Sequence, residues 1–143
     1  MSTAQQSLTY RQFERMTFER PTELVRGELA EQDMPTSQHG SIVLAIGSEL
    51  RKWARATRHG ATFCNDSFVL TVRDPDTVRG PDCAFIRRER LPSGKLPEGV
   101  LEIPVDLAVE VLSPSDRWTD MRGTSGESLR RAGRGGWVVD QHR

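Results

Sequence analysis

The chain is poor in lysine and contains no long apolar run, and each of these shortages restricts the classes of protein to which it can belong. Only two of its 20 basic residues are lysines, Lys52 and Lys95. The 20 basic residues are balanced by 20 acidic ones, so the chain has no overall basic field of the kind that marks many nucleic-acid-binding domains. No stretch reaches the roughly 20 apolar residues that a membrane-spanning helix needs. Residues 1–13 also lack the layout of a signal peptide, so we expect a cytoplasmic, bacterial-type protein with no membrane partner.

Cysteine is equally scarce. Cys64 and Cys83 are the only two, and no CxxC or paired Cys/His spacing is present. Structural zinc sites need such closely spaced ligands, so zinc is not expected. The sequence predicts two reduced thiols in or near strands.

The remaining composition is that of one soluble domain, and we expect residues 1–143 to form it. Thr9 to Gln12 has the pattern of a capping box, which predicts a short helix to about residue 16. Apolar residues recur at helical spacing over residues 38–58, with a basic outer side. β-forming residues and turn signals predict a hairpin over residues 23–30 and strands within residues 61–72, 81–86, 106–112 and 137–140. This order predicts an α/β fold with a mixed central sheet.

Two acidic residues stand in or beside the predicted strands. Asp82 begins one strand, and Glu110 lies inside the next among apolar neighbours. Two carboxylates on adjacent strands can converge on one hard cation such as Mg²⁺, which polarises a phosphodiester and generates hydroxide near neutral pH. Spacing alone favours the plainer interpretation, in which Asp82 is a turn acid and Glu110 is a paired edge residue.

A series of short motifs favours the metal-binding interpretation of Asp82 and Glu110 over the plainer one. The motifs follow one another over nearly the whole chain: Leu8–Tyr10 with Phe13, Glu23–Leu29, His39–Gly40, Phe68–Leu70, Pro81–Phe85, Val109–Ser115 and Trp137–Asp140. In this order the chain resembles the Uma-type restriction-endonuclease-like proteins, a branch of the PD-(D/E)XK nuclease superfamily. Each motif alone is weak, whereas the full series, with VEVLSPS near its end, is specific.

The resemblance implies a fold, an activity and a set of site residues. It implies a restriction-endonuclease-like core, with a mixed central sheet flanked by helices, that hydrolyses DNA phosphodiester bonds. Asp82, Glu110 and the main-chain carbonyl of Val111 would bind Mg²⁺ or Mn²⁺. Glu28 and His39 match positions near the site in the family. Glu28 could equally be a solvated strand acid, and His39 a surface or capping residue at the start of the long helix. The resemblance leaves open whether the chain forms a homodimer, because no feature of the sequence decides its oligomeric state.

The chain departs from the family at the lysine. The simplest superfamily motif places a lysine two residues after the glutamate, where this chain has Leu112. Uma-type members move the lysine to the following helix, at a position that matches Thr124. Arg122 lies two residues before it and is the candidate substitute. The alternative function is therefore a catalytically impaired relic that binds nucleic acid or protein. Similar chains also continue past the strand at 137–140, so we expect C-terminal truncation of the core.

Residues 123–136 have an unusual composition, because they contain five of the twelve glycines of the chain. The sequences on either side of this segment are typical of a helix and of a strand. Each interior glycine costs a helix about 1 kcal/mol relative to alanine. We hypothesise that this coding segment is read in a shifted frame. Translation of the other two forward frames is expected to give an amphipathic helix with a lysine. Absence of such a helix from both frames would mean true divergence of the segment.

Overall fold

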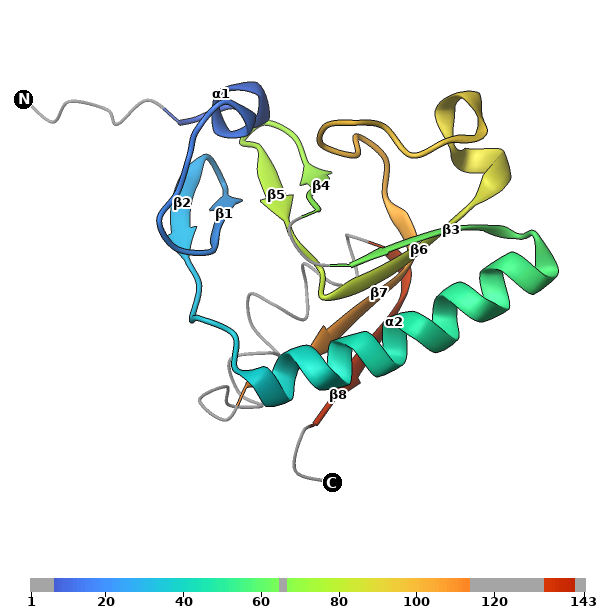
Figure 1. Ribbon diagram of the computed structural model, residues 1–143. Coiled ribbons are helices and arrows are strands. Elements are labelled where there is room, and N and C mark those ends of the chain that lie inside the picture. The colour runs from blue at the N-terminus through green and yellow to red at the C-terminus, as the bar shows by residue number, and fades with distance from the viewer. Residues whose placement is uncertain (1–6, 65–66, 114–132, 141–143) are drawn as a thin grey trace, which may run out of the picture.

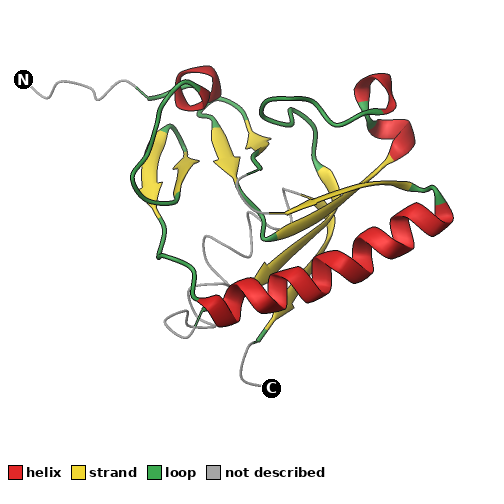
Figure 2. Ribbon diagram, in the orientation of Figure 1, coloured by secondary structure: helices red, strands yellow, loops and turns green. Residues whose placement is uncertain are grey.

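The computed structural model describes residues 7–64, 67–113 and 133–140, and in this part the strands form two four-stranded sheets (Figures 1 and 2). The first sheet is antiparallel and has the order β2 (Glu28–Glu31), β1 (Thr22–Val25), β5 (Thr77–Arg79), β4 (Val69–Val72). The second sheet has the order β3 (Gly60–Cys64), β6 (Cys83–Arg87), β7 (Val105–Val111), β8 (Gly133–Val139). It is mixed, because β8 runs parallel to β7 while the other pairs are antiparallel. The predicted α/β class and mixed sheet are confirmed.

The N-terminal elements follow local sequence signals. In α1 (Tyr10–Glu14), the Thr9 side chain accepts a hydrogen bond from Gln12 N, and the Gln12 side chain accepts one from Thr9 N, as the capping box predicted. β1 (Thr22–Val25) and β2 (Glu28–Glu31) pair through a two-residue turn. Both turn residues, Arg26 and Gly27, have positive φ, the conformation that fits the twist of a tight hairpin.

The long helix α2 (Ser37–Thr57) packs along the second sheet, as Figure 1 shows. Its N-cap is Thr36, whose hydroxyl accepts a hydrogen bond from His39 N at 3.2 Å. The buried residues His39, Val43, Leu50 and Ala54 recur at helical spacing along one face. The helix ends at Thr57, and its C-cap, Arg58, takes the left-handed conformation.

The second sheet forms the centre of the core. Its strands are β3 (Gly60–Cys64), β6 (Cys83–Arg87), β7 (Val105–Val111) and β8 (Gly133–Val139). Ile86, Val105 and Val109 are fully buried, which is the burial expected of central strands. β4 (Val69–Val72) and β5 (Thr77–Arg79) complete the first sheet, and short 3-10 turns at Arg88–Arg90 and Pro92–Gly94 interrupt the loop before β7.

The expected strand boundaries differ from the structure in several places. β6 begins at Cys83, so Asp82 lies just before this strand and not at its start, and β7 is shifted by one residue. The β-forming run at residues 61–72 divides into β3 and β4, which belong to different sheets. β5 was not predicted. β8 starts at Gly133 rather than at Trp137, because its parallel pairing with β7 supplies backbone partners where the glycines supply no side-chain packing. None of the helices in the described ranges is long and apolar enough to cross a membrane.

The first sheet yields a stability prediction. Leu24 on β1 is fully buried and packs with Phe13, Leu70 and Val78. Leu24→Ala is expected to lower the free energy of unfolding by about 3 kcal/mol, because it removes buried methyl groups and leaves a cavity. Leu44 on α2 is 70% exposed, so Leu44→Ala is the matched control and is expected to change it by less than about 0.5 kcal/mol. Urea denaturation measures both, and equal losses would contradict the packing described here.

Candidate functional site

A cavity of about 300 Å³ lies where the two sheets and the start of α2 meet. The chain passes from β5 in the first sheet to β6 in the second through Gly80, Pro81 and Asp82. The first sheet contributes Glu23, the second contributes Glu110 and Val111, and α2 contributes His39. The cavity is therefore lined by ionisable side chains that are distant in the sequence.

Asp82 is fixed from two directions. Its Oδ2 atom accepts a hydrogen bond from Val111 N at 2.7 Å and lies 3.3 Å from His39 Nε2. His39 Nε2 also lies 3.2 Å from the carbonyl oxygen of Val111. Both neighbours of Nε2 are acceptors, so this ring nitrogen carries the proton and donates it. The predicted ligands Asp82 and Val111 are thus held together by one buried imidazole.

Glu110 is placed where its charge is unfavourable. Burial raises the pKa of Glu110 well above its usual range, and the neighbouring carboxylates of Asp82 and Glu23 raise it further. Arg79 acts in the opposite direction. Burial also raises the pKa of Asp82, against the hydrogen bond from Val111 N and the proximity of His39. The two carboxyl groups interact directly, so a proton held between them relieves the repulsion.

A buried ion pair supports this arrangement from the first sheet. Glu23 Oε2 pairs with Arg79 Nη1, and Glu23 Oε1 accepts a hydrogen bond from Gly80 N at 2.8 Å. The side chains of Glu23 and Arg79 are each 13% exposed. Leu24 pairs with Val78, which places Glu23 opposite Arg79 across the ladder. This pair fixes the crossover immediately before Asp82.

The structure brings together four of the residues named from the sequence and separates one. Asp82, Glu110, Val111 and His39 all line the cavity. Glu28 is exposed on β2, beyond the hairpin turn, and does not line it. His39 is 8% exposed, so it is buried against the site rather than a surface residue. Arg122 and Thr124 lie outside the described residues.

Sequence reasoning missed Glu23 and Arg79. In the sequence, Glu23 stands within the hairpin motif and Arg79 belongs to no motif. No local signal marks Glu23, because successive side chains of a strand point to opposite faces and a polar residue beside inward-facing ones is ordinary. Its partner Arg79 lies 56 residues away, so only the pairing of β1 with β5 identifies it.

The donor atoms of the cavity fit a hard divalent cation. Within residues 7–64, 67–113 and 133–140, no group of three or more His, Cys, Asp and Glu side chains is arranged to hold a metal ion. Mg²⁺, however, is commonly bound by one or two carboxylates, with water and substrate phosphate completing its shell. Asp82, Glu110 and the Val111 carbonyl supply oxygen donors of that kind. A cation would also neutralise the repulsion that raises the pKa of Glu110.

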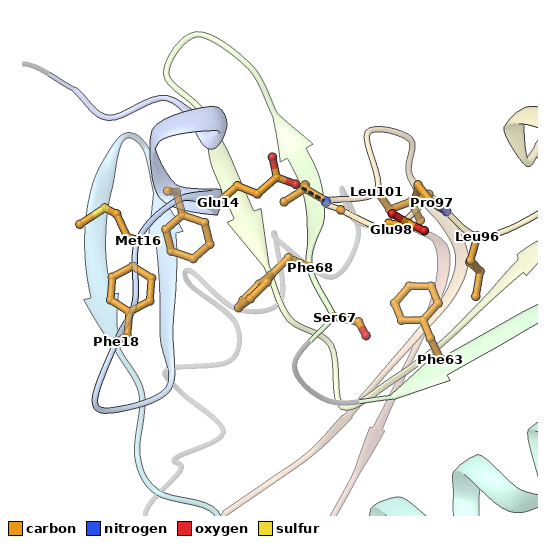
Figure 3. A pocket seen from close by; sticks show the side chains of 13 residues that line it. Glu14, Met16, Phe18, Phe63, Ser67, Phe68, Leu96, Pro97, Glu98 and Leu101 are labelled. Atoms are coloured by element: carbon orange, nitrogen blue, oxygen red, sulfur yellow. Dashed lines mark hydrogen bonds between the residues drawn. The ribbon is translucent and has the colours of Figure 1, made fainter.

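Figure 3 shows a second cavity, of about 300 Å³, that differs from the first in chemistry. Phe13, Phe18, Phe63 and Phe68 line it, and Glu14 is occupied by a hydrogen bond from Val100 N at 2.9 Å. Phe68 also lines the first cavity. Glu14 and Glu98 are the carboxylates of the aromatic cavity, and no histidine is among the described residues that line it. The first cavity, with its carboxyl pair and buried histidine, is therefore the better candidate for catalysis.

Comparisons with known proteins agree with this fold. A family model described as "Uma2: Putative restriction endonuclease" matches residues 9–143. A crystal structure from Anabaena variabilis, titled as a "putative nuclease belonging to DUF820", superposes with a TM-score of 0.75. It is 21% identical, and the match covers 93% of this chain and 74% of that one. No curated protein matches the chain.

The carboxyl pair predicts how stability depends on pH without divalent cations. Because the pKa of Glu110 is raised in the folded state, folded protein binds this proton more tightly than unfolded protein. The resulting stabilisation is complete below the unfolded-state pKa of about 4.3 and is lost as pH rises through the raised folded-state pKa. Glu110→Gln removes the titrating group, so we expect it to be more stable than the wild type at pH 8. Urea denaturation at pH 5 and pH 8 measures the difference.

Glu28→Gln is the matched control, because Glu28 is exposed and outside the cavity. The stability of the Glu28→Gln protein is expected to depend on pH in the same way as that of the wild type. A Glu110→Gln protein that is less stable than the wild type at pH 8 would show that the Glu110 carboxylate is well stabilised when charged, contrary to this account.

Proposed function

Because the chain belongs to the Uma2 family, we propose that it is a metal-dependent endonuclease that hydrolyses phosphodiester bonds of DNA in the cytoplasm. One observation carries the proposal. Asp82 on one side, and the consecutive residues Glu110 and Val111 on the other, come from two separate places in the sequence and line the same cavity together with a buried histidine. These are the residues that the superfamily motif assigns to metal binding.

The metal-binding role rests on the chemistry of these donors. Asp82, Glu110 and the Val111 carbonyl would hold Mg²⁺ or Mn²⁺. When bound, such an ion supplies polarisation of the phosphodiester and a lower pKa for the attacking water. The second carboxylate then becomes stable in its charged form, because the cation offsets the repulsion from the first.

The protein's own residues position these donors. His39 donates from Nε2 toward Asp82 and the Val111 carbonyl, and thereby orients two of the three oxygen donors. The hydrogen bond from Val111 N directs Asp82 Oδ2 toward the end of β7. Glu23 and Arg79 hold the crossover that leads into Asp82. Preorganised donors of this kind avoid a reorganisation cost during the reaction.

DNA binding is proposed to involve the basic outer face of α2. Arg51, Arg55 and Arg58 are exposed there, and they are not engaged in the ion pairs found among the described residues. Arginines of this kind contact phosphates and provide affinity that weakens with salt, with no sequence preference of their own.

The proposal is tested by nicking of supercoiled plasmid DNA with Mg²⁺ or Mn²⁺. The wild type is expected to convert supercoiled plasmid to the open-circular form. Asp82→Asn and Glu110→Gln are expected to reduce the rate by about a hundredfold or more, since each removes one charged ligand. Glu28→Gln is the matched acidic control and should retain the wild-type rate. Chelation of the divalent ion should abolish the reaction in every variant.

Folding and metal binding are measured separately from cleavage. Circular dichroism establishes that each protein is folded, and calorimetric titration with Mn²⁺ measures binding directly. Cleavage that persists in both carboxylate variants would refute this site. A folded wild type that binds Mn²⁺ but cuts nothing would favour the impaired relic, in which the missing lysine, and not metal binding, is the lesion.

A further inference from the structure

The two cysteines, which are 19 positions apart in the sequence, are in contact in the fold. Cys64 ends β3 and Cys83 begins β6, and the antiparallel register places them directly opposite each other. Their sulfur atoms lie 3.0 Å apart, and both are free thiols. A disulfide bond has a sulfur separation of about 2.05 Å, so closure requires a movement of about 1 Å.

The backbone position is also the one that suits a cross-strand disulfide. His59 lies opposite Arg88, one position beyond Gly60 and Arg87. Arg88 N donates to His59 O, so His59 and Arg88 form a hydrogen-bonded pair. Hydrogen-bonded and non-hydrogen-bonded pairs alternate along an antiparallel ladder. The register is continuous from Gly60 opposite Arg87 to Cys64 opposite Cys83, so the cysteines occupy a non-hydrogen-bonded pair. Cα atoms in such pairs are about 4.5 Å apart, within the range that disulfides span.

Helix α2 leaves room for the two sulfurs. A Cβ atom added at Gly47 would lie 2.7 Å from Cys64 Sγ and 3.4 Å from Cys83 Sγ. Any larger residue at this position would push into the thiol pair. The glycine is otherwise unfavourable in a helix interior, by roughly 0.5–1 kcal/mol relative to alanine. The packing of α2 therefore preserves the contact between the thiols at a cost to the helix.

We propose that Cys64 and Cys83 are a redox modification site that forms a reversible disulfide by exchange with a low-molecular-weight disulfide. Cys64 is exposed, so its thiolate attacks one sulfur of the reagent, and the first small thiol leaves. Cys83 is fully buried and cannot meet the reagent. It resolves the mixed disulfide by attacking Cys64 Sγ, its proton leaves with the second small thiol, and the reagent is reduced as the two cysteines are oxidised.

The bond would join two parts of the second sheet beside the candidate catalytic site. Among the strands that the structure describes, β3 is the outer strand next to β6. Cys83 directly follows Asp82, so the bond would anchor the start of β6 to β3. It would also close the segment between Cys64 and Cys83 into a covalent loop, which restricts the unfolded chain. The oxidised protein is therefore expected to unfold at a temperature several degrees higher than the reduced protein.

The test is oxidation of the folded protein with oxidised glutathione at fixed pH, followed by intact-mass measurement and alkylation. The wild type is expected to lose the mass of two hydrogen atoms, resist alkylation and return to the starting mass with dithiothreitol. Cys83→Ala is expected to retain glutathione on Cys64, because the resolving thiol is absent. Cys64→Ser is expected to stay unmodified while folded. A wild type that keeps glutathione on Cys64 with an alkylatable Cys83 would overturn the proposal.

A pair of glycine variants separates this geometry from ordinary thiol oxidation. Gly47→Ala is expected to slow the resolution step roughly tenfold or more, because the added methyl displaces a reacting sulfur. Gly40→Ala on the same helix is the matched control, since nothing lies within 4 Å of its added Cβ, and it should leave the rate unchanged. Equal rates in the two folded variants would contradict the proposed role of the α2 contact. Circular dichroism establishes folding before each reaction.

Discussion

The repulsion between two partly buried carboxyl groups, Asp82 and Glu110, is the constraint on which the candidate site depends. Each is held in place by contacts within the fold, and burial alone would favour the neutral form of both. The protein offsets this cost for Asp82 with the Val111 amide and His39. For Glu110, the charge of Arg79 acts in this favourable direction. A bound cation is the general physical means of stabilising both charges together.

The same constraint explains why the site lies at a crossover. Asp82 belongs to the segment that leaves the first sheet and enters the second, so its position depends on how both sheets are built. The Glu23–Arg79 pair and the bond from Gly80 N fix that segment from β1. His39 is fixed in turn by the Thr36 cap at the start of α2. The carboxyl pair is thus held by contacts between elements and not by any local motif.

This dependence on distant contacts decides how much could be predicted from the sequence. Capping residues, the Arg26–Gly27 turn and the helical repeat of α2 are local, and the expected elements formed there. The division of residues 61–72 between two sheets could not be foreseen, because β-forming composition does not specify the partner strand. Asp82 and Glu110 were identified from their places in or beside adjacent predicted strands, and the family resemblance added Val111 and His39. Glu23 and Arg79 were recognisable only once β1 was paired with β5.

The start of β6 joins the two chemistries found in this fold. Asp82 and Cys83 are adjacent in the chain, but they face different surroundings. Asp82 lines the cavity with His39 and Glu110, while Cys83 packs against Val43 and Gly47 of α2. His39 lies on that same helix, one turn before Val43. A change in how α2 packs on β6 would therefore act on the thiol pair and on the contact between His39 and Asp82 at once. Helix α2 is thus a common structural neighbour of the thiol pair and of the carboxyl pair.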